Sequence, residues 1–270
     1  MLALDCHVHL YQFTDLPTLL RTAAANSKKN CRYSKTGARE EGGKSILPTL
    51  ILTEPNGRDS YARLRQAAVS AGNAIDGWRL RPCGDGLGVF ANHDDGAMAL
   101  IISGQQVVTA ERLEILAIAC RPDIEDNQPL TDTLSAIYRR DAFPVFPWGV
   151  GKWLGRRGSL LAALIANARP GDFALADTIS RPVCWPEPRL AAARARGLAV
   201  LRGTDPLPIT GQVKKAGSFG SLVALPFDSE RPASSLLAAL RGGPLNIFSF
   251  GQPDSCHAFL RAQLALRARR

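Results

Sequence analysis

Histidine is scarce in this chain, with 4 among 270 residues, and no apolar run reaches the roughly 18 to 20 residues that a membrane span requires. Acidic Asp5 also stands where a signal peptide would carry basic residues. We therefore expect a soluble, cytoplasmic protein with no membrane partner. The 6 cysteines are scattered, with no C-x-x-C pair and no spacing typical of a zinc knuckle or a disulfide framework, so we expect reduced thiols.

The charge balance of the chain favours anionic partners. Lysine and arginine number 33 against 24 acidic residues, which gives a formal net charge of +9. Such an excess favours phosphorylated substrates or nucleic acid, although charge alone supports nucleic acid only weakly. It leaves the fold and the oligomeric state open.

Strand-like and helix-like segments alternate along most of the chain. An N-terminal strand precedes an expected helix over 15–26, and a polar, glycine-containing stretch over 27–44 is expected to form a loop. Dense turn signals between short apolar segments predict an antiparallel meander over 78–119. From Asp132 onward helices and strands alternate again, which is typical of parallel strands wrapped by helices. We find no repeat or linker, so residues 1–270 are predicted to form one domain, a distorted (β/α) TIM-like barrel of the α/β class with an antiparallel strand insertion near 78–119.

Two of the four histidines stand together in the opening stretch LALDCHVHL. Side chains two apart on a strand point to the same side, so His7 and His9 would converge on one spot. Two converging imidazoles can begin a metal site. Such a pair can also end a strand with each ring hydrogen-bonded to a neighbour, so the assignment depends on acidic partners elsewhere.

Acidic side chains fall at the ends of other expected strands, where the loops of a β/α barrel share one face. They are Glu54 in LILTEP, Asp177 in FALADT and Asp205 in LRGTDPLP. Each of them alone also fits a turn. Together with His7 and His9 they predict a site for one divalent ion, and imidazole and carboxylate ligands favour zinc, manganese or iron over calcium.

The loop GVGKWLGRRG over 149–158 follows another strand end and precedes an expected helix. Its glycines allow a ligand to approach the backbone, and Lys152 and Arg156 supply charge for an oxyanion beside a helix N-terminus. Trp148 and Trp153 are candidates to line the same pocket. Lys152 is followed by tryptophan rather than serine or threonine, so this is not a Walker A loop. The alternative is an ordinary solvated loop.

The segment LDCHVHLYQFTDLPTLLRTAA resembles the opening D-x-H-x-H strand and helix of the PHP superfamily, the polymerase and histidinol phosphatase type of metal-dependent phosphoesterases. LPTLILTEPN is similar to the second strand of that family, IISGQQVVTAERLEILAIA to its third and fourth, and ARGLAVLRGTDPLP to its final strand. The resemblance implies a distorted β/α barrel with a metal site. The order of motifs spans most of the chain, and the first and last motifs match best.

Several positions depart from the PHP pattern. Glu54 and Pro55 stand in place of Asp-His, Gln106 in place of a bridging glutamate, Pro147 and Trp148 in place of His-Pro, and Pro206 and Leu207 follow Asp205 where a final histidine is expected. The resemblance therefore implies one ion, or none, rather than several. GTDPLP is also similar to the last strand of the amidohydrolase barrels, which share a first-strand H-x-H.

The sequence supports the hypothesis of a metal-dependent hydrolase that acts on a small anionic substrate, above all a phosphoester. The predicted residues are His7, His9, Glu54 and Asp205 for the ion, Asp205 and Asp177 for catalysis, and Lys152, Arg156 and Trp148 for the substrate. The cofactor would be one zinc, manganese or iron ion. The alternative hypothesis is a degenerate barrel that binds a ligand or a partner protein without catalysis.

Overall fold

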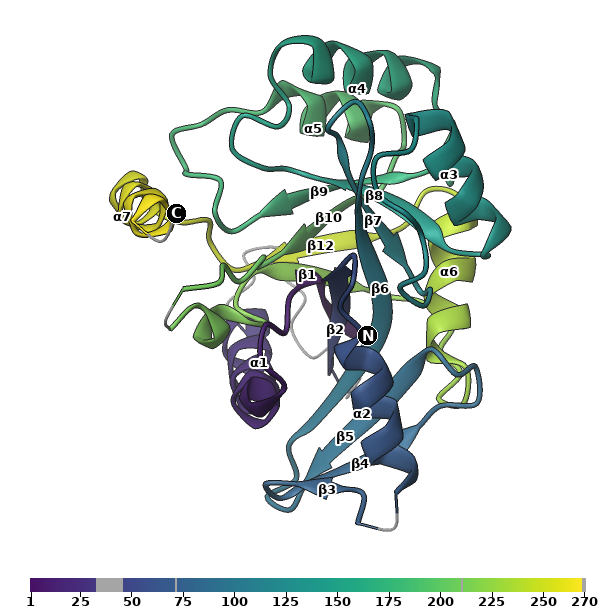
Figure 1. Ribbon diagram of the computed structural model, residues 1–270, viewed down its shortest axis with the longest axis vertical. Helices are drawn as coiled ribbons and strands as arrows, with labels where there is room; N and C mark the ends of the chain where they lie inside the picture. The colour runs from purple at the N-terminus through teal and green to yellow at the C-terminus, as the bar shows by residue number, and fades with distance from the viewer. Residues whose placement is uncertain (33–45, 71, 210, 269–270) are drawn as a thin grey trace.

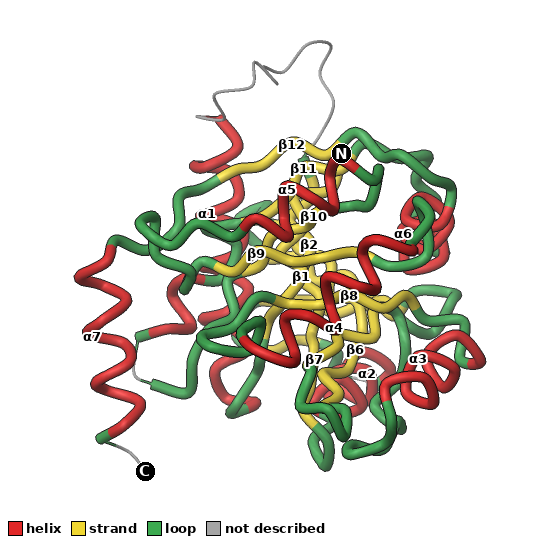
Figure 2. The backbone as a smooth tube through the Cα atoms, turned by 90° about the horizontal axis from the view of Figure 1, so that it is seen from above, coloured by secondary structure: helices red, strands yellow, loops and turns green. Residues whose placement is uncertain are grey.

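A curved mixed sheet forms the centre of the structure, a computed structural model that describes residues 1–32, 46–70, 72–209 and 211–268. Its strands follow the order β10-β9-β8-β7-β6-β2-β1-β11-β12, and β3, β4 and β5 attach beside β6. The strands are β1 (Leu2–Val8), β2 (Leu47–Pro55), β3 (Ala74–Ile75), β4 (Trp78–Pro82), β5 (Gly88–His93), β6 (Met98–Val108), β7 (Glu114–Ile118), β8 (Phe143–Pro147), β9 (Ala174–Thr178), β10 (Val200–Gly203), β11 (Gly220–Val223) and β12 (Ile247–Phe250). The helices are η1 (Phe13–Asp15), α1 (Leu16–Arg32), α2 (Ser60–Val69), α3 (Leu130–Arg139), α4 (Gly155–Asn167), α5 (Pro188–Ala195), η2 (Gln212–Lys215), α6 (Pro232–Arg241) and α7 (Cys256–Arg267). Figure 1 and Figure 2 show the helices arranged around the strands.

The sheet curls into a nearly closed barrel because the end of β10 lies beside β1. There the Asp205 amide donates to the His7 carbonyl at 2.8 Å. Parallel pairing joins β1 to β2, β2 to β6, β8 to β9 and β9 to β10, so the carboxyl ends of these strands share one rim. This arrangement confirms the distorted TIM-like barrel, and the shared rim is where such barrels gather functional side chains.

The antiparallel insertion is also confirmed. β4, β5, β6 and β7 pair antiparallel in chain order, and β7 pairs antiparallel with β8. Gly96, at a φ of 85°, closes the turn between β5 and β6, where its amide donates to the His93 carbonyl at 3.0 Å. Because β6 also pairs parallel with β2, it belongs to both the meander and the barrel.

Apolar side chains alternate between the inside and the outside of the barrel. The inner cluster joins strand residues such as Leu4, Ile51 and Leu201 to Leu236 and Leu240 of α6. Two outer clusters lie between the sheet and the helices, one under α3, α4 and α5 and the other under α1 and α2. Within the described ranges, no helix has both the length and the apolar character needed to cross a membrane.

Two expectations about the secondary structure need correction. β11 is antiparallel to β1 and β12, although the alternation from Asp132 onward predicted parallel strands. Parallel neighbouring strands need a crossover connection, usually an α-helix. Among the described residues between β10 and β11, the only helix is the short η2. The loop predicted over 27–44 begins later, because buried Ser27 and Cys31 extend α1 to Arg32; residues 33–45 lie outside the described residues.

The expectation that all cysteines are reduced is wrong for one pair. Cys184 and Cys256 form a disulfide with their Cα atoms 6.6 Å apart, although 72 positions separate them in the sequence. Backbone hydrogen bonds bring the two segments together, from Val183 to the Asp254 carbonyl and from Asp254 to the Ile179 carbonyl. The other four cysteines are buried and free: Cys6, Cys31, Cys83 and Cys120.

Candidate metal centre

His7, His9 and Asp205 converge at the carboxyl end of β1 and form a candidate metal site. The two Nε2 atoms lie 3.0 Å apart, and they lie 3.7 Å (His7) and 3.5 Å (His9) from Oδ1 of Asp205. Donors about 2.1 Å from a tetrahedral ion stand about 3.4 Å from one another. The triangle of donor atoms is therefore close to the size that one divalent ion requires.

Asp5 joins the strand that carries the histidines to the segment that carries Asp205. Its buried carboxylate accepts from the Thr204 hydroxyl at 2.5 Å, the Thr204 amide at 2.8 Å and the Gly217 amide at 2.9 Å. Burial raises the pKa of Asp5 to about 6, although these hydrogen bonds act in the opposite direction. The Asp5 hydrogen bonds thus hold β10 against β1 next to the donor triangle.

Gly203 permits this close approach of the two strands. A Cβ atom at this position would lie 2.7 Å from both the backbone nitrogen and the Cβ of His7. Contacts that short would push the backbones of β10 and β1 apart. Glycine is therefore needed where β10 passes β1.

The backbone of Asp205 is strained. Its φ is 43°, in the left-handed region, and Pro206 follows it, although residues before proline favour extended conformations. A non-glycine residue in this region costs roughly 1–2 kcal/mol. Residues held in this way are concentrated at functional sites, and here the conformation turns a carboxylate toward two histidines.

The ionisation of His7 and Asp205 suits metal binding. Burial lowers the pKa of His7 to about 4, although nearby Asp205 raises it, so the imidazole is neutral at pH 7. Burial alone would raise the pKa of Asp205, but the two histidines and Lys152 hold it well below its usual value. Metal ligands must be neutral imidazoles and ionised carboxylates. The His7 imidazole and the Asp205 carboxylate are therefore in the states that metal binding requires.

Other side chains border the donor triangle. Oε1 of Gln106, on β6, lies 3.1 Å from Nε2 of His7. The Tyr11 ring lies 5.5 Å from the His9 ring, and the Arg58 guanidinium lies over Tyr11, 5.7 Å from the ring centroid. Among the described residues, neither histidine Nδ1 has a hydrogen-bond partner. Among the described side chains, the two rings are therefore contacted through Nε2 and through ring packing.

Glu54 is buried but is not part of the donor triangle. Its side chain is at the end of β2, 1% exposed, and Oε2 accepts from the Tyr61 amide at 3.0 Å in the first turn of α2. Burial raises the pKa of Glu54, while hydrogen bonds from Tyr61 and Ser60 lower it. Its role as an added ligand stays a prediction.

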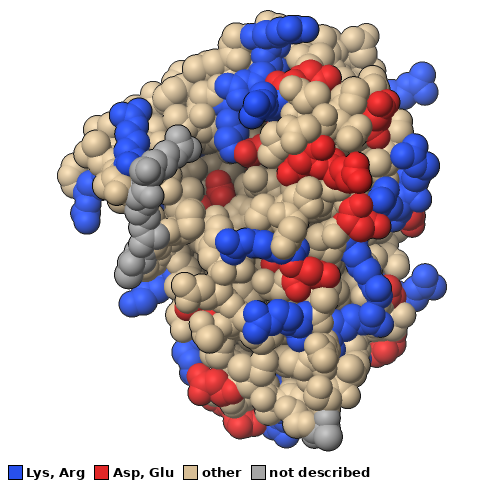
Figure 3. All heavy atoms as spheres, in the orientation of Figure 1, with Lys and Arg blue, Asp and Glu red and all other residues tan. Residues whose placement is uncertain are grey.

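The two basic residues predicted to hold the substrate have different surroundings. Lys152 forms an ion pair with Glu114 of β7, and its charge acts on both His7 and Asp205. Arg156 is exposed at the start of α4. Figure 3 shows a hollow in the surface that carries an acidic side chain, with basic side chains above and below it. On this face acidic side chains lie among the basic ones.

Asp177 and Trp148 lie at other strand ends of the same rim. Asp177, on β9, is 1% exposed and forms a bidentate ion pair with Arg181, with oxygen to nitrogen distances of 2.7 and 2.8 Å. Trp148 follows β8, is 2% exposed and packs edge to face against Trp185 with ring centroids 5.9 Å apart. The predicted roles of both residues in the site stay predictions.

Several residues that the structure brings to the site have no role predicted from the sequence. Asp5 is the first residue of the D-x-H-x-H motif, and Gln106 is indicated only by the family resemblance. Glu114 carries no such signal. Tyr11 and Arg58 carry no sequence signal, because their positions depend on how the segments after β1 and β2 fold onto the rim.

Comparisons with known proteins bear on the fold. No protein-family model matches the chain, and no curated protein matches it. Among solved structures, PsfC from Pseudomonas syringae PB-5123 is similar with a TM-score of 0.61 and 14% sequence identity over 99% of this chain and 98% of that one. A two-domain protein containing a predicted PHP-like metal-dependent phosphoesterase, from Bacteroides vulgatus ATCC 8482, gives a TM-score of 0.46 and 13% identity over 91% of this chain and 64% of that one. The likeness to PsfC shows a shared fold along nearly the whole chain.

Proposed function

We propose that residues 1–270 form one barrel domain that acts as a divalent-metal-dependent hydrolase on a small anionic substrate, a phosphoester. One observation carries this proposal, the convergence of His7, His9 and Asp205 at the carboxyl rim of the barrel. The resemblance of the D-x-H-x-H strand to the PHP superfamily supports the same reaction class.

The donor set fits a small group of metals. Two imidazoles and one carboxylate with open positions are found in zinc hydrolases and in non-haem iron sites. Zinc, manganese or iron therefore suits the site better than calcium, which prefers oxygen ligands. A divalent ion held here would polarise a substrate oxygen and lower the pKa of a water molecule.

The residues of the chain have distinct roles in this proposal. Asp205 is partly exposed, with 20% of its side chain accessible, so it can orient a water molecule and accept its proton at a carboxylate oxygen. Glu54 is the added ligand, and its carboxylate would have to leave the Tyr61 amide to reach the ion. Asp177 is a supporting acidic group, held in place by Arg181.

The substrate anion is assigned to the basic loop before α4. Lys152 is already near the donor triangle, and an incoming phosphate would compete with Glu114 for its ammonium group. Arg156 would supply a second positive charge, and Trp148 forms part of the wall behind the loop. This competition predicts that removing the carboxylate of Glu114 strengthens binding of the anion.

The test is hydrolysis of p-nitrophenyl phosphate by protein that has been stripped with a chelator and then supplied with zinc, manganese or ferrous ion. We expect turnover only after metal is added, and a loss of at least about 100-fold in Asp205→Asn. His93→Gln is the matched control, because His93 ends β5, away from the donor triangle, and contacts Arg21 and Asp95. Equal turnover in metal-free and metal-loaded protein would contradict the proposal. A metal-loaded protein that hydrolyses none of a panel of phosphoesters would favour the alternative, a barrel that binds without catalysis.

A further inference from the structure

A cavity lies at the opposite end of the barrel from the candidate metal centre. Leu2 and Leu47, at the starts of β1 and β2, line it, whereas His7 stands near the other end of β1. A strand rises about 3.3 Å per residue, so the five steps from Leu2 to His7 separate the two places by about 17 Å. The cavity is therefore distinct from the proposed hydrolase site.

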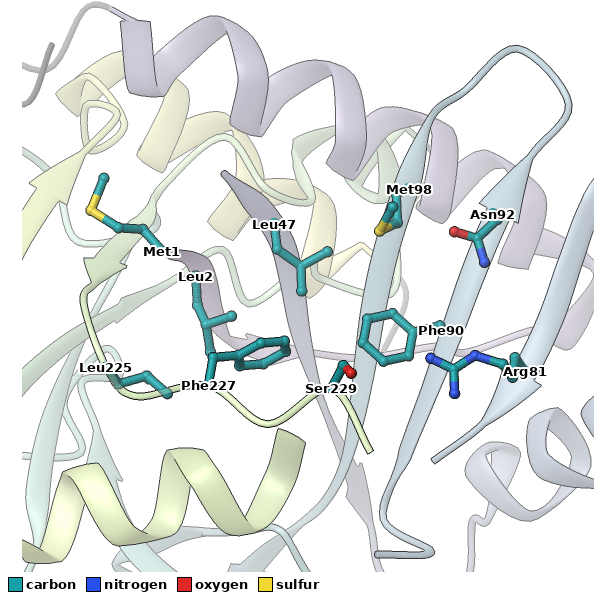
Figure 4. A pocket seen from close by; sticks show the side chains of 10 residues that line it. All are labelled: Met1, Leu2, Leu47, Arg81, Phe90, Asn92, Met98, Leu225, Phe227 and Ser229. Carbon is teal, nitrogen blue, oxygen red and sulfur yellow. The ribbon is translucent and has the colours of Figure 1, made fainter. Parts of the chain in front are cut away.

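The cavity has the size and the lining of a small-molecule site. Its volume is about 350 Å³, within the range of pockets that bind small ligands. Most of the side chains that line it are apolar. Figure 4 shows Leu47, Phe90 and Phe227 pointing toward one another, with Arg81 and Asn92 at one side.

The β5–β6 hairpin and the segment after β11 form the walls of the cavity, and some of their apolar side chains are exposed to solvent. Phe90, Asn92 and Met98 share one face of the β5–β6 hairpin, since Asn92 and Met98 are register partners and Phe90 is two residues from Asn92. The segment after β11, with Leu225 and Phe227, forms the facing wall. Met98 is 44% exposed and Phe227 is 40% exposed. Large apolar side chains exposed around one cavity mark a binding site more often than isolated ones do.

Arg81 supplies a positive charge at the polar side of the cavity. Its guanidinium lies over the Phe90 ring, 4.8 Å from the centroid, and its NH1 group donates to Glu230 at 3.1 Å. The Arg81–Glu230 pair is exposed, with 48% and 66% of the side chains accessible, and such pairs contribute little to stability. A guanidinium carries five N–H donors, so Arg81 can bind a second carboxylate beside Glu230 or in its place.

We propose that this cavity binds an amphipathic carboxylate, with the hydrocarbon part among Leu47, Phe90 and Phe227 and the carboxylate on Arg81. Charge complementarity selects the head group, because Arg81 is the cationic side chain among the residues that line the cavity. The apolar lining selects the hydrocarbon part. The binding is independent of the metal centre at the other end of the barrel.

The first test compares three probes with the same ten-carbon chain: decanoate, decanol and decyltrimethylammonium, each below its micelle concentration. Isothermal titration of the full chain should show decanoate binding at least about tenfold more tightly than decanol, since the lost contact is a charge-assisted hydrogen bond. Decyltrimethylammonium should not bind. Equal affinities for decanoate and decanol, or no binding of either, would overturn the proposal.

Matched variants separate the head-group contact from the hydrocarbon contact. Arg81→Met should reduce decanoate affinity to that of decanol, whereas Glu230→Gln, which breaks the same ion pair from the other side, should leave it unchanged or tighter. Met98→Glu should abolish binding, and Val69→Glu, the same replacement at a more exposed apolar residue outside the cavity, should not. Unchanged decanoate affinity in Arg81→Met would refute the assignment of the carboxylate.

Discussion

Replacing Thr204 by valine tests whether the Asp5 hydrogen bonds hold the two sides of the candidate site together. Valine has the shape of threonine but lacks the hydroxyl that donates to Asp5 at 2.5 Å. Both groups are fully buried. A hydrogen bond to a charged group contributes about 1.5–3 kcal/mol, so Thr204→Val should lower the free energy of unfolding by that amount at pH 7, where Asp5 is largely ionised.

Thr53→Val is the matched control for this prediction. Thr53 is equally buried, and its hydroxyl donates to the Val8 carbonyl at 3.2 Å, an uncharged acceptor. The same substitution there should cost only about 0.5–1.5 kcal/mol. Guanidinium unfolding of metal-free protein measures both losses of unfolding free energy. The comparison holds if the slope of that free energy against denaturant concentration is the same in all variants. If Thr204→Val costs no more than Thr53→Val, the role given to Asp5 is wrong.

Three further predictions concern the strand contact, ionisation and the disulfide. Gly203→Ala should lower the free energy of unfolding by about 1–3 kcal/mol and weaken metal binding, because its Cβ meets His7; normal metal affinity in this variant would count against the close approach. In metal-free protein the pKa of His7 is about 4 in the folded state, against 6.5 for an unperturbed histidine. Between these two pH values the folded state binds fewer protons than the unfolded state. His7 therefore raises the free energy of unfolding by up to about 3 kcal/mol as the pH rises from 4 to 6.5. His7→Gln should lack this increase. If the free energy of unfolding changes with pH between 4 and 6.5 by the same amount in the variant as in the native protein, the prediction is wrong. Reduction of Cys184 and Cys256, which enclose a loop of 72 positions, should cost about 4 kcal/mol and lower Tm; an unchanged Tm in reductant would show that the bond does not stabilise the fold.

Local sequence patterns predicted the part of the site that depends on strand geometry. The period of two predicted that His7 and His9 converge, and they do so at the end of β1; the strand end predicted for Asp205 lies on the same rim. The alternation of helices and strands predicted the barrel, because a strand followed by a helix and another strand favours parallel pairing.

Contacts between distant segments could not be predicted from one sequence. The Asp5 carboxylate meets Thr204 and Gly217, which are 199 and 212 positions away, and the disulfide joins cysteines 72 positions apart. The antiparallel direction of β11 also depends on how the chain returns from β10 rather than on its own apolar pattern. Such features depend on how the barrel closes, and the spacing of residues along the chain does not predict them.

The metal content of purified protein tests the central claim most directly. The native chain and a His7→Ala, His9→Ala double variant are dialysed identically and analysed for zinc, manganese and iron, and circular dichroism checks that both are folded. The account predicts about one ion per native chain and none in the double variant. Native protein that holds no ion, even after reconstitution with each metal, would contradict it.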